Sequence, residues 1–235
     1  MCTLAFEYQK ESLIIGFNRD EITERNIAYS PQLIEKNNLK ILAPIDPVGS
    51  GTWIGVNQLG RVACLMNHTH YKKQYNLTYL RSRGQLVSDI LGLVHEQPFF
   101  YVQTHAAYFA PFHLFVFDTN MAFRVTWNGF ELHFYTISYG SYSYSSTTLY
   151  NKETAVKRDI EWKKIAEKEK KEYENFLNTC RIQKRVNPLG KEVCTVSFTW
   201  LKRDKKQAYM EYQPLYPETD KKTTSQLLFS EYVAE

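Results

Sequence analysis

The chain has 235 residues, a length that fits one large α/β or all-β domain better than two, and we expect a single domain over residues 1–235. Hydrophobic residues make up 43% and charged residues 23%, which excludes a disordered or low-complexity chain. The 29 basic and 25 acidic residues leave a net charge of only +4, and this balance argues against a nucleic-acid-binding protein.

Four scattered cysteines are too few for a disulfide scaffold, and none has the Cys/His spacing of structural zinc. We therefore predict no metal and no cofactor. The N-terminus lacks the basic and apolar segments of a signal peptide, and no run approaches the roughly 20 apolar residues of a membrane span. These features favour a cytoplasmic protein, and they leave the oligomeric state open.

The first third of the chain reads as hairpins. Residues 3–8 and 13–18 are apolar runs on either side of a polar turn, and residues 52–57 and 62–67 repeat the pattern. The pairing of residues 3–8 with residues 13–18 leaves two alternatives. Cys2 and residues 18–21 lie at opposite ends of the paired strands, or they lie close together if the pairing is offset. No pattern is visible in residues 26–40, which we expect to form a loop.

Helices and further strands follow. Apolar residues at helical spacing predict a helix over residues 83–95, closed by Pro98, and a long helix over residues 151–179. The second helix would bury Val156, Ile160, Ala166, Tyr173 and Leu177 on one face. Strands are predicted at residues 113–118, 121–127, 130–137, 193–201 and 207–212. Hairpins dominate this order, so we expect an α+β fold of antiparallel sheets with helices packed outside.

Cys2 is the most informative position for chemistry. A methionine before a small residue is readily removed, and removal would give Cys2 a free α-amine. The amine has a reference pKa of roughly 7.7–8 and the thiol about 8.5, so one group can take the proton of the other. The alternative is an ordinary apolar cysteine in the first strand.

Polar residues at the ends of the predicted strands could complete such a site. Residues 18–21, Asn-Arg-Asp-Glu, could hold an α-amine and lower the pKa of a thiol. Asn57 and Asn67 each end a strand of the second hairpin, and asparagine side chains can donate to the oxyanion of an acyl-transfer intermediate. Residues 145–148 supply further neutral donors.

Several segments resemble a known family. The start MCT, the segment FNRDE, the run GSGTWIGVNQLGRVACLMN and the segment LRSRGQLV closely resemble the NRDE family, whose eukaryotic member is transport and Golgi organisation protein 2. YSSTTLYNKETAVKRDIEW and VCTVSFTW look like its prokaryotic branch. That family resembles the N-terminal nucleophile hydrolases, including penicillin V acylase and bile salt hydrolase. The resemblance implies a four-layer αββα sandwich of two antiparallel sheets between helices.

The resemblance also implies roles for particular residues. Cys2 matches the nucleophile, Asp20 the carboxylate that binds its amine, and Asn67 the oxyanion asparagine. Arg19 lies in the right motif but is shifted by two places, because Phe17 occupies the position equivalent to the arginine of the hydrolases.

This chain also departs from the hydrolases in two places. Their second oxyanion asparagine falls near Ser146 and Thr147, and their downstream arginine has only Arg158 as a loose counterpart. The segment glycine-threonine-arginine-serine is replaced by residues 190–193.

Other conspicuous residues have two interpretations each. His68 and His70 could ligate a metal or a haem iron, but no third ligand is spaced to join them, and pocket-lining histidines are favoured. Trp53 lies between Gly51 and Gly55, which allow close backbone approach, so it is expected in a core or a pocket wall.

The start of the helix predicted at residues 83–95 is a further candidate. Arg83 and Gly84 could present an anion-binding helix N-terminus, although an ordinary capping turn explains them equally well.

Two functional hypotheses result. The first is an N-terminal nucleophile hydrolase of a small-molecule carbon–nitrogen amide bond, with catalytic residues Cys2, Arg19, Asp20 and Asn67. Its substrate-binding residues would be Asn18, Trp53, Asn57, Ser146 and Arg158. The second is a non-catalytic carrier of an apolar ligand such as haem or lipid, a role implied by the eukaryotic relative alone.

Overall fold

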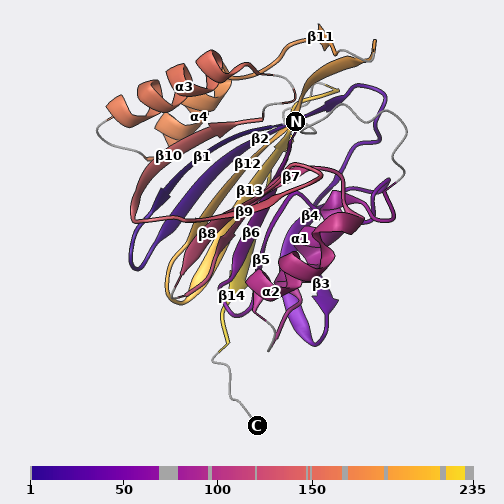
Figure 1. The fold of residues 1–235 in the computed structure, drawn as a ribbon. Coiled ribbons are helices and arrows are strands. Elements are labelled where there is room, and N and C mark those ends of the chain that lie inside the picture. Colours follow the sequence, from indigo (N-terminus) through magenta and orange to yellow (C-terminus); the bar gives the residue numbers. More distant parts are fainter. Residues whose placement is uncertain are drawn as a thin grey trace.

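The computed structural model describes residues 2–68, 79–94, 97–119, 121–146, 148, 150–165, 169–187, 190–217 and 221–230. These residues form two seven-stranded sheets in which every strand pair is antiparallel (Figure 1). The first sheet has the order β10-β1-β2-β12-β13-β14, with β11 paired to β12, and the second runs from β3 to β9 in sequence order.

The strands of the first sheet are β1 (Cys2–Tyr8), β2 (Leu13–Ile22), β10 (Gly140–Ser145), β11 (Arg185–Val186), β12 (Glu192–Arg203), β13 (Gln207–Pro214) and β14 (Thr223–Leu228). Those of the second are β3 (Tyr29–Lys36), β4 (Leu39–Ile45), β5 (Ile54–Asn57), β6 (Val62–Asn67), β7 (Phe112–Phe117), β8 (Ala122–Trp127) and β9 (Leu132–Thr136). The helices are α1 (Arg83–Leu91), α2 (Pro98–His105), the short 3₁₀ helix η1 (Ala106–Tyr108), α3 (Lys152–Lys164) and α4 (Lys170–Thr179).

Three apolar cores separate four layers. Helices α3 and α4 cover the outer face of the first sheet, and α1 and α2 cover that of the second (Figure 1). The largest core lies between the sheets. Strand β1 shows how period-two alternation builds these layers, because Leu4 and Phe6 face the other sheet while Ala5 faces the helices. The predicted αββα sandwich is confirmed.

The first hairpin pairs β1 with β2 so that Cys2 lies opposite Arg19 and Tyr8 lies opposite Leu13. Of the two predicted alternatives, the one with Cys2 close to residues 18–21 is correct, and it needs no offset. The hairpin over residues 52–67 and the strands predicted from residue 113 to residue 137 are also present, as is the hairpin of β12 and β13.

Two segments differ from the sequence-based expectation near the second sheet. Residues 26–40 are not a loop, because they contain β3 and the start of β4, joined at Asn37 and Asn38 with positive φ angles of 51° and 63°. The helix predicted at residues 83–95 ends at Leu91. Pro98 does not close it but begins α2, where the missing N–H of proline costs no hydrogen bond.

The single helix predicted over residues 151–179 is wrong. The chain forms α3 and α4, and Ile165 leaves the helical conformation between them. In one continuous helix Trp162 and Tyr173 would lie about 16 Å apart along the axis. In the structure their ring centroids are 4.7 Å apart, because the break lets both rings pack on the same sheet. Val156 and Ile160, predicted to be buried, are 51% and 49% exposed. Ala166 lies outside the described residues.

No helix in the described part of the chain is both long and apolar enough to cross a membrane.

Replacing Trp162 with alanine should test this packing. The side chain is fully buried between α4 and the first sheet, so Trp162→Ala should lower the free energy of unfolding by about 3–5 kcal/mol. Val156→Ala, an exposed change in the same helix, should change it by less than about 0.5 kcal/mol. Urea denaturation measures both, and equal losses in the two variants would contradict the packing.

Candidate active site

A cleft of about 180 Å³ opens at the end of the sandwich where β1 begins and β2 ends. Residues from both sheets and from the start of α1 line it. They include Cys2, Arg19, Asp20, Trp53, Asn67 and Arg83. The cleft therefore brings together the four predicted catalytic residues and one of the predicted substrate-binding residues.

Cys2 is buried in this cleft, with 4% of its surface exposed. It shares the inner face of the first sheet with Arg19, since residues directly opposite in an antiparallel pair point to the same side. Burial raises the pKa of the Cys2 thiol, and the positive charge of Arg19 acts in the opposite direction. The thiol is thus in an apolar setting with a cation at its edge.

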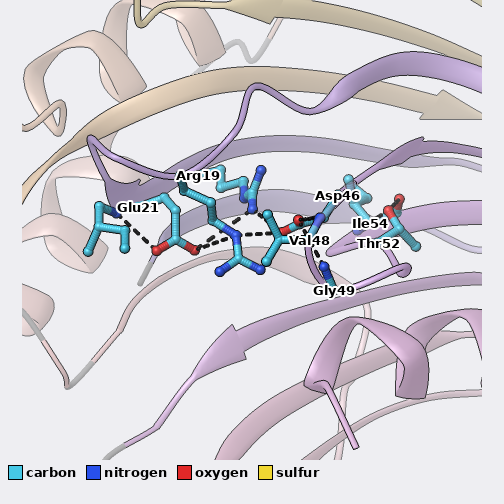
Figure 2. Close-up of polar contacts among 9 residues, drawn as sticks. Arg19, Glu21, Asp46, Val48, Gly49, Thr52 and Ile54 are labelled. Atoms are coloured by element: carbon cyan, nitrogen blue, oxygen red, sulfur yellow. Dashed lines mark hydrogen bonds and ion pairs between the residues drawn. The ribbon is translucent and has the colours of Figure 1, made fainter.

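Arg19 joins the two sheets through a network of charges (Figure 2). Its guanidinium donates to the carboxylate of Asp46, which follows β4 in the second sheet, and Arg25 donates to the same oxygen over 2.8 Å. Glu21 lies 3.8 Å from Arg19 and 3.7 Å from Arg25. Burial alone would raise the pKa of Asp46, but the hydrogen bond from Arg25 and the charge of Arg19 outweigh burial and lower it.

The loop after β4 is shaped around the same carboxylate. The other oxygen of Asp46 accepts from the backbone N–H groups of Val48 at 2.9 Å and Gly49 at 3.2 Å (Figure 2). Gly51 then meets the start of α1, where a Cβ atom would lie 2.3 Å from the carbonyl carbon of Gly84. Only glycine fits at this contact, which fixes α1 against the cleft.

Trp53 forms a wall of the cleft. The Arg19 guanidinium lies 4.2 Å from the centroid of its ring, a cation–π contact, and only 7% of the tryptophan is exposed. Trp53 is therefore both part of the core between the sheets and part of the cleft wall, the two places expected for it.

Asp20 is 1% exposed, and two hydroxyl groups hold it. Thr195 donates to one carboxylate oxygen at 2.6 Å, and Tyr150 donates to the other at 2.9 Å. Burial raises the pKa of Asp20 to about 6, although both hydrogen bonds lower it. In the described part of the chain no lysine or arginine forms an ion pair with this carboxylate.

A β-bulge in β12 places Thr195 beside Asp20. The pairing of β12 with β2 shifts between Thr195 and Ser197, so Val196 is the extra residue. Without it, alternation would put Thr195 on the inner face with Ser197, away from Asp20. The bulge turns the Thr195 hydroxyl to the outer face, where Asp20 lies.

Asn67 reaches the cleft from the end of β6, and Ser146 ties it to the first sheet. The Ser146 hydroxyl donates to the carbonyl oxygen of Asn67 at 2.6 Å, while the Ser146 N–H donates to the carbonyl of Cys2 at 2.9 Å. Ser146 is fully buried, and its role here is to set the spacing between Cys2 and Asn67. Thr147 lies outside the described residues.

Besides Ser146, three predicted substrate-binding residues do not line the cleft. Asn18 points to the outer face and donates to the carbonyl of Leu177 at 2.7 Å. Asn57 stabilises the β5–β6 turn, where its side-chain oxygen accepts from two backbone N–H groups, and it donates to Leu91 at 2.8 Å. Arg158 lies on the outer face of β1 and β10, where it bonds Thr3, Ser145 and the Cys180 carbonyl and stacks on Tyr150.

Of the predicted histidine pair, the structure describes His68, which lies beside His113. The ring of His68 lies 4.2 Å from that of His113, and His113 bonds the Thr126 hydroxyl at 2.9 Å. Burial is the main reason that the pKa of His113 falls to about 3. His70 lies outside the described residues.

Sequence reasoning missed four residues around the cleft: Arg25, Asp46, Tyr150 and Thr195. Arg25 follows Glu21 at a spacing of four residues, but it lies in a turn where helical spacing has no meaning. The other three come from distant parts of the chain. Tyr150 and Thr195 lie in segments that resemble the family, but nothing in those segments assigns a role to either residue, because contacts between distant segments bring them to the cleft.

Comparison with solved structures finds neighbours of similar fold, and three of them follow. A mutant of conjugated bile acid hydrolase from Clostridium perfringens superposes with a TM-score of 0.58 and 12% identity, over 96% of this chain and 96% of that one. The N-acylethanolamine-hydrolyzing acid amidase orthologue of Caenorhabditis elegans superposes with a TM-score of 0.53 and 12% identity, over 86% of this chain and 92% of that one. Penicillin V acylase from Agrobacterium tumefaciens superposes with a TM-score of 0.51 and 10% identity, over 91% of this chain and 83% of that one. At these identities the likeness is one of fold.

Sequence comparison is more specific about ancestry. No curated protein matches the chain. The sequence model of the transport and Golgi organisation 2 family, however, matches residues 1–232, nearly the whole chain, as the motifs around Cys2 and residues 18–21 predict. The chain therefore belongs to the transport and Golgi organisation 2 family.

Proposed function

We propose that this protein is an N-terminal cysteine amidohydrolase that cleaves the carbon–nitrogen bond of a small-molecule amide. The observation that carries the proposal is Asp20, a buried carboxylate without an ion-pair partner among the described residues, next to the strand position that faces Cys2. The fold shared with three amide-cleaving enzymes supports it.

An unpaired buried carboxylate is costly, because a charge removed from water needs a partner or must become neutral. Neutral hydroxyls satisfy both oxygens of Asp20 but do not balance its charge. Removal of Met1 would free the α-amine of Cys2, which becomes cationic when it takes the thiol proton. The strand partner of Cys2 directly precedes Asp20. The missing counter-ion of Asp20 is thus the group that an N-terminal nucleophile requires.

The reaction then proceeds by acyl transfer. The α-amine takes the thiol proton of Cys2, and the sulfur attacks the amide carbonyl carbon to give a tetrahedral oxyanion that the Asn67 side chain stabilises. The C–N bond breaks as the amine leaves with a proton from the α-ammonium group. Water then attacks the thioester and releases a carboxylic acid and the free thiol. Asp20 holds the amine, and the positive charge of Arg19 favours the thiolate.

The cleft favours this reaction over carriage of haem or a long acyl chain. Pockets for drug-sized ligands occupy roughly 300–1,000 Å³. The described cleft has about 180 Å³, and three arginines and three carboxylates contribute to its lining. This space fits a compact polar group better than a large apolar one.

The nucleophile is tested by mass spectrometry of the intact protein incubated with a series of small aryl amides. Wild-type protein should lack Met1 and should acquire one acyl group on Cys2. Cys2→Ala should acquire none, and Asn67→Ala should acylate roughly 10²–10³-fold more slowly because it lacks an oxyanion donor. Cys194→Ala removes a buried thiol outside the cleft and should behave like wild type. Complete retention of Met1 would exclude the mechanism.

Removal of the Thr195 hydroxyl tests how Asp20 is held. The pKa of Asp20 is about 6 in the folded protein and 3.8 without the fold, so the protonated carboxyl contributes stability below about pH 3.8 that is lost as the pH rises through 6. Thr195→Val removes a hydrogen bond that lowers this pKa, so the folded pKa should rise further. Urea denaturation should show an additional loss of about 1–3 kcal/mol at pH 7.5 relative to pH 4.

Thr199→Val is the matched control. Thr199 is buried in the same strand, and its hydroxyl has no hydrogen-bond partner in the described structure. Its stability change should be the same at both pH values. Thr195 also accepts from the N–H of Ile182, and loss of that bond should cost the same at both pH values. A pH-independent difference between Thr195→Val and wild type would contradict the proposed state of Asp20.

A further inference from the structure

Six charged side chains line the cleft, and four of them compensate one another. Arg19 and Arg25 share the carboxylates of Asp46 and Glu21, with two positive and two negative charges in one network. Asp20 and Arg83 remain outside it. Asp20 is the carboxylate that we assign to the α-amine of Cys2. Arg83 is the corresponding cation without a carboxylate partner among the described residues.

The Arg83 guanidinium is anchored but not neutralised. One of its nitrogens donates to the carbonyl oxygen of Pro111 at 3.0 Å, a neutral acceptor. Burial lowers the pKa of Arg83, while the negative charge of Glu21 and a thiolate at Cys2 act to raise it. An arginine stays charged in proteins, so it contributes a half-buried positive charge at the wall of the cleft that holds Cys2.

The backbone around Arg83 adds to this positive field. Arg83 is the first residue of α1, whose first turn contains no acidic residue, and the side chain of Ser82 at the N-cap makes no capping hydrogen bond. The positive end of the helix dipole therefore faces the cleft without a negative group of its own. Gly51 packs on Gly84, and the N–H of Thr52 donates to the Gly84 carbonyl at 3.1 Å, which holds this helix end against the cleft.

We propose that Arg83 determines substrate specificity by binding a carboxylate group that the substrate carries close to its scissile amide. The inference rests on the proposed function, because it names the substrate class of that site. A planar guanidinium and a carboxylate form charge-assisted hydrogen bonds, and the partial burial of Arg83 strengthens them. The small volume of the cleft suits a compact acidic group, such as that of an N-acylated amino acid, beside the amide.

The test compares a carboxylate with its neutral analogue. N-acetylglycine and N-acetylglycinamide are titrated into Cys2→Ala protein by isothermal calorimetry, which reports binding whether or not Cys2 reacts. The carboxylate should bind roughly tenfold to a hundredfold more tightly, as expected for a hydrogen bond to a charged group. Arg83→Gln, made in the same background, should bring the two affinities close to each other.

Two further variants separate the effect of a positive charge from that of the guanidinium geometry and of its position. Arg83→Lys keeps the charge but not the fork of donors, and it should retain part of the preference. Arg185→Gln removes one positive charge from the exposed strand β11, outside the cleft, and should keep all of it. Circular dichroism establishes that each variant is folded.

The outcomes separate this inference from the proposed function. Equal binding of the two ligands to the Cys2→Ala protein, or a preference that survives Arg83→Gln, would overturn the role of Arg83. If Arg83 acted only on the thiol of Cys2, the ligand preference would not change, and instead the pH profile of Cys2 alkylation would shift to higher pH in Arg83→Gln. A carboxylate preference in a protein that retains Met1 would support the binding site and refute the hydrolase mechanism.

Discussion

The contact between Arg19 and Asp46 is the interaction on which the cleft depends. It crosses from the first sheet to the second, and it occurs where the apolar core between the sheets ends. A charged pair at the rim needs further polar partners, and Arg25, Glu21 and the backbone of the loop after β4 provide them.

The positive and negative charges of this network balance one another. The two charged residues of the cleft outside it, Asp20 and Arg83, are therefore the candidates for binding a charged ligand group. A structural ion-pair cluster with equal numbers of each sign does not call for a ligand. Asp20 and Arg83 lie at the same cleft and have opposite signs, yet each bonds only neutral groups in the described part of the chain. The cleft thus offers one negative and one positive position around a buried thiol, which is the pattern expected for an amine on one side and an acidic substrate on the other.

The sequence predicted the local half of this structure. Alternation within the first hairpin is sufficient to place Cys2 and Arg19 together, and the same alternation assigns Asn18 to the opposite face, where it bonds α4. Asn57 precedes a tight turn, a position where asparagine typically bonds the backbone. The adjacent Asn37 and Asn38 are typical of a hairpin turn, so the hairpin of β3 and β4 was within reach of the same reasoning.

The remaining half depends on contacts between distant segments. No pattern in residues 151–179 indicates that the helix ends at Ile165, because the segment contains neither proline nor glycine, and the packing of Trp162 on Tyr173 cannot be read from local sequence. Thr195 reaches Asp20 only through the bulge at Val196, and alternation in β12 alone predicts the wrong face. Asp46 becomes part of the site only once the order of strands in the second sheet is known.

Ser146 shows how the same fold can distribute roles differently. In the resemblance to the hydrolases, this region corresponds to a second asparagine that donates to the oxyanion. Here the hydroxyl of Ser146 donates to the backbone of Asn67, and it also contacts the hydroxyl of Thr148 at 2.8 Å. A hydroxyl has a single proton to donate, so a Ser146 that holds Asn67 cannot also stabilise an oxyanion. In the proposed reaction, side-chain stabilisation of the oxyanion therefore rests on Asn67, and Ser146 contributes by fixing the distance between that asparagine and Cys2.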